Sequence, residues 1–65
     1  MSTAKVIEII AEGKSIEGAI ANGVKDVAES VHAIKGVWVE NTQAIVEGAE
    51  VTAFRVNLKI TFVVD

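Results

Sequence analysis

The chain has 65 residues, of which 51% are hydrophobic, and it carries a net charge of −3 with one histidine and no cysteine. A domain this short buries only about 60% of the surface that its unfolded chain exposes. Disulfides and a cysteine–histidine zinc site are both excluded as sources of extra stability. Burial of apolar surface between subunits remains, so we expect a single domain over residues 1–65 that forms a homo-oligomer.

The charge pattern also excludes two classes of partner. No stripe of lysine and arginine is present to displace counterions from phosphates, which argues against nucleic acid. No apolar run approaches the ~18 to 20 residues of a membrane-spanning helix, and the N-terminus lacks the apolar core of a signal peptide. We therefore expect no membrane association and a cytoplasmic location.

The first predicted element is a strand at Lys5–Ala11, which is rich in isoleucine and valine and too short for a helix. The letters EGKS follow at residues 12–15 and resemble the end of a phosphate-binding loop. That loop needs a glycine five residues before Gly13, where this chain has Glu8. We interpret residues 12–14 as a turn and Ser15 as the N-cap of a helix.

Apolar residues after Ser15 recur at helical spacing, which predicts a helix that ends near residues 33–35. Gly36 follows directly and is expected to terminate it. Gly23 lies within the apolar stripe, where glycine costs ~1 kcal/mol against alanine, so we expect the helix to approach the sheet or a neighbour closely there. The residues of the stripe are Ile16, Ile20, Val24, Val27, Val31 and Ile34.

Two strands are predicted at residues 37–46 and 51–65, on either side of the turn EGAE at residues 47–50. The last strand alternates apolar and polar residues from Phe54 to Val64, which indicates one core face and one largely polar face. The order strand, helix, strand, strand favours an α+β domain in which a three-stranded antiparallel sheet wraps one helix.

A two-residue loop at Gly48 and Ala49 would fix the pairing of the last two strands. The pairs expected on the helix-covered face are Val37–Ile60 and Val39–Leu58, and those expected on the opposite face are Trp38–Lys59, Glu40–Asn57 and Thr42–Arg55. The only tryptophan therefore lies on the face without a helix. It must be buried by another subunit, stacked against a ligand, or left exposed.

The segments KVIEII, IKGVWVE and FRVNLKITFVVD, with the capped helix from Ser15, resemble the dodecins over nearly the whole chain. The resemblance implies the β-α-β-β fold and a hollow homo-dodecameric shell. Many dodecins bind flavins such as riboflavin or FMN in stacked pairs near the two-fold axes. In these proteins a tryptophan stacks on the ring and a glutamine hydrogen-bonds its polar edge.

Two positions of the resemblance identify candidate site residues. The family's stacking tryptophan aligns with Gly36, whereas Trp38 lies two residues later and would share its face of the strand. The family's glutamine aligns with Arg55, which offers only donors. Some dodecins with arginine at this position are described as calcium-binding. We expect Trp38, Arg55 and Gly36 to form a site for a flat aromatic ligand, a flavin, held for storage or sequestration. The alternative is the same shell with the flavin site lost, binding calcium or serving as a structural assembly.

The remaining polar residues give no catalytic pattern. His32 is expected in the last helical turn, without a second histidine, a cysteine or paired carboxylates to form a metal site. Glu47 and Glu50 flank the hairpin tip without a calcium-loop motif. No serine–histidine–aspartate set or carboxylate pair can be identified, so we do not expect an enzyme.

Overall fold

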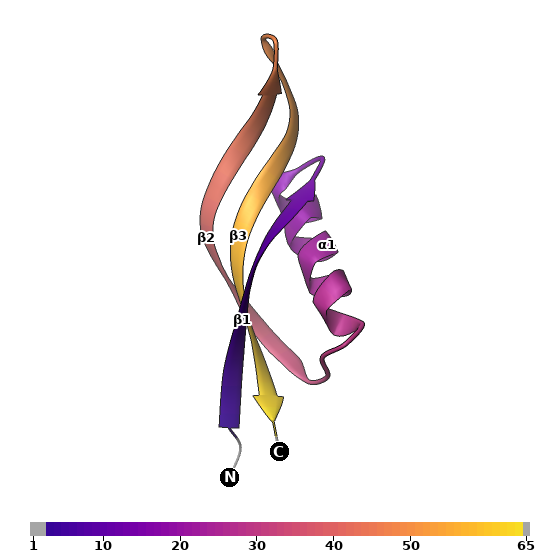
Figure 1. Cartoon of the computed structure of the whole chain (residues 1–65), viewed down its shortest axis with the longest axis vertical. Helices are drawn as coiled ribbons and strands as arrows, with labels where there is room; N and C mark the ends of the chain where they lie inside the picture. Colours follow the sequence, from indigo (N-terminus) through magenta and orange to yellow (C-terminus); the bar gives the residue numbers. More distant parts are fainter. Residues whose placement is uncertain (1–2, 65) are drawn as a thin grey trace.

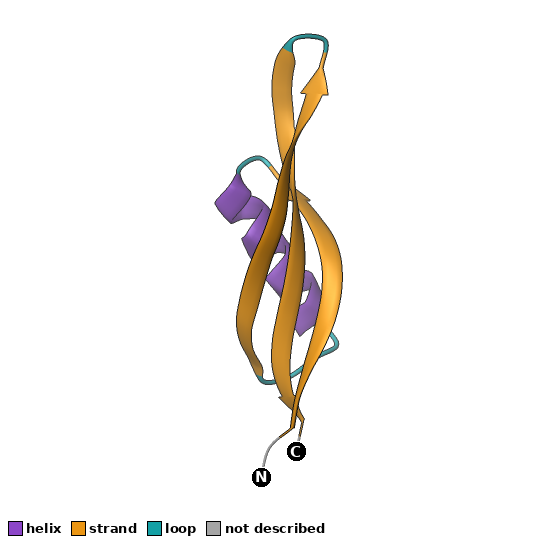
Figure 2. Cartoon of the chain, turned by 90° about the vertical axis from the view of Figure 1, so that its left-hand side faces the viewer, coloured by secondary structure: helices purple, strands orange, loops and turns teal. Residues whose placement is uncertain are grey.

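The computed structural model describes residues 3–64, which form three strands and one helix. Strand β1 (Thr3–Gly13) is followed by helix α1 (Ile16–Ala28) and by the long hairpin of β2 (Ile34–Glu47) and β3 (Glu50–Val64). The sheet is antiparallel in the order β1-β3-β2, and α1 lies against one face of it (Figures 1 and 2). The predicted α+β fold and the β-α-β-β order are confirmed.

The strands are longer than predicted, and the β2–β3 hairpin extends well past the N-terminal end of α1 (Figure 1). The molecule is accordingly elongated, with extents of 51 × 20 × 13 Å. The tight turn uses Gly48 at φ 63°, a conformation that glycine adopts without strain. Residue 65, included in the predicted last strand, lies outside the described residues.

Helix α1 begins as predicted. The Ser15 hydroxyl accepts a hydrogen bond of 2.9 Å from the backbone N–H of Gly18, and Ser15 has the extended backbone of an N-cap. The preceding turn is shorter than predicted, because Glu12 and Gly13 are still paired with β3 as the last residues of β1.

The predicted end of the helix is wrong. Helix α1 ends at Ala28, and Ala33, with φ 61°, reverses the chain into β2. Ile34 matched the helical spacing but is the first residue of β2, packed against the edge of the core. Gly36 lies inside β2 opposite Thr61 and does not terminate the helix. An apolar residue entering the core from a strand matched the helical period by coincidence.

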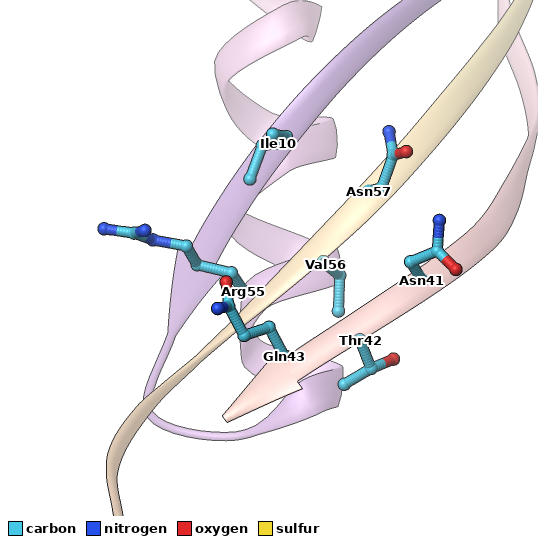
Figure 3. A pocket seen from close by; sticks show the side chains of 7 residues that line it. All are labelled: Ile10, Asn41, Thr42, Gln43, Arg55, Val56 and Asn57. Carbon is cyan, nitrogen blue, oxygen red and sulfur yellow. The ribbon is translucent and has the colours of Figure 1, made fainter. Parts of the chain in front are cut away.

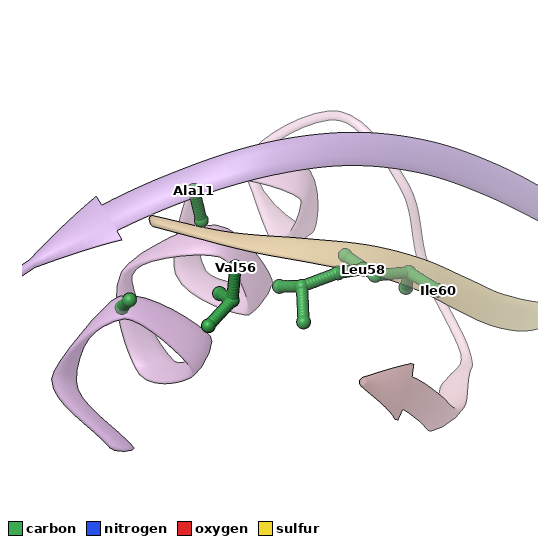
Figure 4. Packing of buried hydrophobic residues seen from close by; sticks show 5 residues of the cluster. Ala11, Val56, Leu58 and Ile60 are labelled. Carbon is green, nitrogen blue, oxygen red and sulfur yellow. The ribbon is translucent and has the colours of Figure 1, made fainter. Parts of the chain in front are cut away.

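The core lies between α1 and the sheet (Figure 4). Val56, Leu58 and Ile60 are fully buried on alternate positions of β3, as the alternation predicted. A Cβ on Gly23 would lie 2.8 Å from Leu58 Cδ1 and 2.9 Å from Ala11 Cβ. The expected close approach of the helix at Gly23 is therefore confirmed, and it is made to the sheet.

The pairing of β2 with β3 follows the prediction only in part. The pairs Val37–Ile60, Val39–Leu58 and Trp38–Lys59 are confirmed, whereas the pairs Glu40–Asn57 and Thr42–Arg55 are wrong. The register shifts by one residue near the hairpin tip and shifts back between Val39 and Asn41. The pairs observed between these two shifts include Asn41–Asn57, Thr42–Val56 and Gln43–Arg55.

Each shift corresponds to a β-bulge with one extra residue. Thr52 is the extra residue in β3, and its hydroxyl donates a 3.4 Å hydrogen bond to the carbonyl oxygen of Ile45. Glu40 is the extra residue in β2, and it forms an ion pair with Lys59 instead of facing Asn57. A loop-length argument cannot predict these bulges, and they determine which β2 side chains stand beside Arg55.

Candidate functional site

The sheet face opposite α1 is called here the open face. Paired residues of antiparallel strands share a face, so the register assigns its members. Arg55, Asn57, Lys59 and Thr61 of β3 alternate with the buried core residues and lie in the middle of it. The flanking members are Val6, Glu8, Ile10 and Glu12 of β1, and Gly36, Trp38, Asn41 and Gln43 of β2.

Trp38 projects from the open face with 60% of its surface exposed. Its partner across the strands is Lys59, whose ammonium lies 3.2 Å from a carboxylate oxygen of Glu40. A large aromatic surface is thus available for stacking on the face where the sequence predicted it.

Gly36 lies beside Trp38 on the same face, because residues two apart in a strand point the same way. A Cβ at Gly36 would lie 3.2 Å from the hydroxyl oxygen of Thr61, which donates to the Gly36 carbonyl at 3.1 Å. Because Gly36 has no side chain, β2 presents none on the open face at the position two residues before Trp38.

A hollow of about 250 Å³ lies farther along the open face (Figure 3). Arg55 is the one predicted site residue in its lining. Trp38 and Gly36 lie outside it, because the Trp38–Lys59 pair is four residues along β3 from Arg55, or about 13 Å at 3.3 Å per residue. The lining residues are Ile10, Asn41, Thr42, Gln43, Arg55, Val56 and Asn57.

Arg55 is held from one side of the hollow. Its Nε donates a 2.9 Å hydrogen bond to Glu12 Oε1, and the two side chains are 51% and 53% exposed. An ion pair this exposed contributes only about 0 to 1 kcal/mol to stability. It nevertheless orients the guanidinium along the sheet and leaves its terminal N–H groups available to an acceptor.

Asn57 is fixed in the middle of the hollow by hydrogen bonds to β1. Its Nδ2 donates to Glu8 Oε2 at 3.1 Å and to the carbonyl oxygen of Ile9 at 3.2 Å. The donor end of this amide is therefore used within the fold. The oxygen of Asn57 remains as its group for a ligand.

Sequence reasoning missed Gln43, Asn41 and Ile10. Ile10 is 72% exposed beside the polar residues of the hollow, which gives the site an apolar wall. The two amides stand on the open face because of the bulge at Glu40. Ile10 could have been found by carrying the face assignment across to β1, but no signal in the sequence marks the bulge.

The described residues show no metal centre. Residues 3–64 contain no group of three or more histidine, cysteine, aspartate or glutamate side chains that could hold an ion. Glu47 and Glu50 face each other at the hairpin tip. The predicted position of His32 is wrong because α1 ends early. His32 follows the helix instead of lying in its last turn, and it lines a separate shallow hollow with Phe62.

Within residues 3–64, the one helix, α1, is too short to cross a bilayer.

Comparison with known proteins agrees with this architecture. The sequence model of the Dodecin family matches residues 3–65. A mutant of the Thermus thermophilus dodecin is similar in structure, with a TM-score of 0.93 and 17% identity, covering 100% of this chain and 98% of that one. The dodecin from Streptomyces davaonensis has a TM-score of 0.92 and 20% identity over 98% of this chain and 96% of its own. The dodecin from Streptomyces coelicolor gives 0.92 and 20% over 98% and 93%. No curated protein sequence matches.

Proposed function

Because this chain belongs to the dodecin family, we propose that it is a flavin-binding protein that stores or sequesters riboflavin or FMN inside a homo-dodecameric shell. The observation that carries this proposal is the exposed indole of Trp38 on a sheet face that no element within residues 3–64 covers. The proposed role is that of a cytoplasmic binding protein and not of an enzyme, with residues 1–65 acting as one domain.

The size of the hollow supports an assembly in which a second copy completes the site. Pockets that enclose a drug-sized ligand have about 300 to 1,000 Å³, and the hollow beside Arg55 has about 250 Å³. A flavin would be only partly buried by one copy. Ile10 and Val6, which are 72% and 50% exposed on the same face, would also be buried by a second copy.

The three candidate residues take distinct roles in this proposal. Trp38 stacks on the flavin ring and supplies most of the attraction. Gly36 leaves space for the ring beside the indole. Arg55 contacts a polar edge of the ring or the phosphate of FMN, since its guanidinium carries donors only.

The test is a titration of the ligand-free protein with riboflavin and with FMN, followed by flavin fluorescence, with the assembly state measured by sedimentation in the same sample. We expect quenching that saturates at a fixed ratio of flavin to subunit. Base–aromatic stacking is worth about 1 to 3 kcal/mol, so Trp38→Ala should weaken binding by about 5- to 150-fold. The matched variant Trp38→Phe should retain most of the affinity.

Two results would contradict the proposal. Unquenched flavin in the presence of an intact large assembly would show that the shell is kept without the flavin site. A folded monomer of 6.9 kDa would contradict the assembly itself.

A further inference from the structure

In the hollow, Arg55 and Asn57 each offer a ligand only one kind of hydrogen-bonding group. The Arg55 guanidinium has only donors, and the donor end of Asn57 is already engaged by Glu8 and Ile9. A ligand edge that alternates acceptor, donor and acceptor needs one protein acceptor between donors. Neither Arg55 alone nor Asn57 alone meets that requirement.

Gln43 stands where such a group is needed. It is paired with Arg55 across β2 and β3, and Figure 3 shows its side chain extending from β2 toward Arg55. The side-chain hydrogen bonds among residues 3–64 engage Arg55 and Asn57 of this hollow but not the Gln43 amide. A carboxamide carries an acceptor and two donors on one planar group, and here all of them are free for a ligand.

We propose that Gln43 forms hydrogen bonds with the imide edge of a planar heterocycle. The flavin ring carries such an edge, in which an N–H group lies between two C=O groups. The Gln43 carbonyl accepts from the imide N–H, its NH₂ donates to one flanking carbonyl, and a terminal N–H of Arg55 donates to the other. The inference rests on the proposed flavin binding and defines its ligand class as rings with a free imide N–H.

Asn41 is the competing candidate in the same hollow. It faces Asn57, the next pair along the open face from Arg55, and its side chain is one methylene shorter. In Figure 3 its amide does not extend toward Arg55 as that of Gln43 does. The paired arrangement of carboxamide and guanidinium therefore favours Gln43.

The experiment compares riboflavin with 3-methylriboflavin, in which a methyl group replaces the imide hydrogen, by fluorescence titration of the assembled protein. A single hydrogen bond is worth about 0.5 to 1.5 kcal/mol, or a factor of about 2 to 10 in affinity. The wild type should prefer riboflavin. In Gln43→Met, which keeps the length of the side chain without its amide, that preference should shrink by about 2- to 10-fold.

Two further variants separate recognition from structure. Gln43→Glu keeps an acceptor at the same place and should keep the preference even if overall affinity falls. Glu17→Gln changes an exposed residue in the first turn of α1, on the other face of the sheet, and should leave both affinities unchanged. Comparison as a double-mutant cycle removes the steric effect of the methyl group, because that effect is common to all variants.

The outcomes distinguish this inference from the proposed function. If the wild type binds neither ligand, the proposed flavin binding and the role of Gln43 are both contradicted. If the wild type binds riboflavin but Gln43→Met keeps the full preference, or if the loss of preference appears in Asn41→Leu instead, the role of Gln43 is overturned while flavin binding stands.

Discussion

The two faces of the sheet are built on the same three strands, but different interactions hold their side chains in place. On the covered face, Val56, Leu58 and Ile60 are fully buried under α1, and their size and shape determine what fits. On the open face, the alternating residues Arg55, Asn57 and Lys59 are held by ion pairs and hydrogen bonds to neighbouring strands. One face stabilises the subunit, and the other leaves groups available to a ligand or another copy.

The comparison implies that neighbouring residues of β3 should differ sharply in what they contribute. Leu58→Ala removes a fully buried side chain and should cost about 2 to 5 kcal/mol of the free energy of unfolding. Lys59→Ala, one residue later on the open face, should cost less than about 1 kcal/mol, since it removes an exposed ion pair with Glu40.

Urea unfolding at a fixed protein concentration would measure both variants, because stability and assembly are linked in an oligomer. Similar costs for the two variants would mean that the open face is as firmly packed as the covered one, and the comparison would fail.

A pair of glycines gives a sharper version of the same test. Gly23→Ala on the covered face would bring a Cβ within 2.9 Å of Ala11 Cβ as well as 2.8 Å of Leu58 Cδ1. Overpacking typically costs about 1 to 3 kcal/mol, and the gain of about 1 kcal/mol in helix propensity offsets part of it. We expect a net loss of roughly 1 kcal/mol and a lowered thermal midpoint.

The matched change on the open face is Gly36→Ala, whose Cβ would meet only the Thr61 hydroxyl, at 3.2 Å. We expect it to change the thermal midpoint little. A stabilised Gly23→Ala protein would show that the helix can move away from the sheet at no cost.

The smallest effect is expected at the edge of the open face. Glu12→Gln removes the charge that faces Arg55 across 2.9 Å, and both side chains are about half exposed. Stability should change by less than about 1 kcal/mol and should become less sensitive to salt. Thermal unfolding at low and high salt would measure this, and a larger loss would mean that Glu12 holds more of the sheet than one exposed ion pair.

The sequence predicted those parts of the fold that depend on local pattern. The alternation in β3 identified the buried residues, and Ser15 identified the start of α1, because a cap and a two-residue period are each visible within a few positions. The end of the helix could not be predicted from the sequence, since Ile34 satisfies the helical spacing and also packs as the first residue of a strand.

The candidate site was less accessible to sequence reasoning than the fold. Trp38 was placed on the correct face because the register near Val37 and Val39 is undisturbed. Gln43 was missed because a bulge on each strand must be known before its face can be assigned. A bulge depends on how two strands fit together over their whole length, so it cannot be predicted from a short segment of the sequence.

The two bulges also have a consequence for how related chains should be compared. Between Glu40 and the hairpin tip, the inside–outside alternation of β2 runs in the opposite phase to the segment from Gly36 to Val39, so that odd-numbered residues take the outward places that even-numbered ones hold at Gly36 and Trp38. Deleting Glu40 would remove the extra residue, so that the segments on either side of it would follow one alternation with their β3 partners unchanged. A relative that lacks one bulge can align with this chain on both sides of the missing residue and still present a different set of side chains to its ligand.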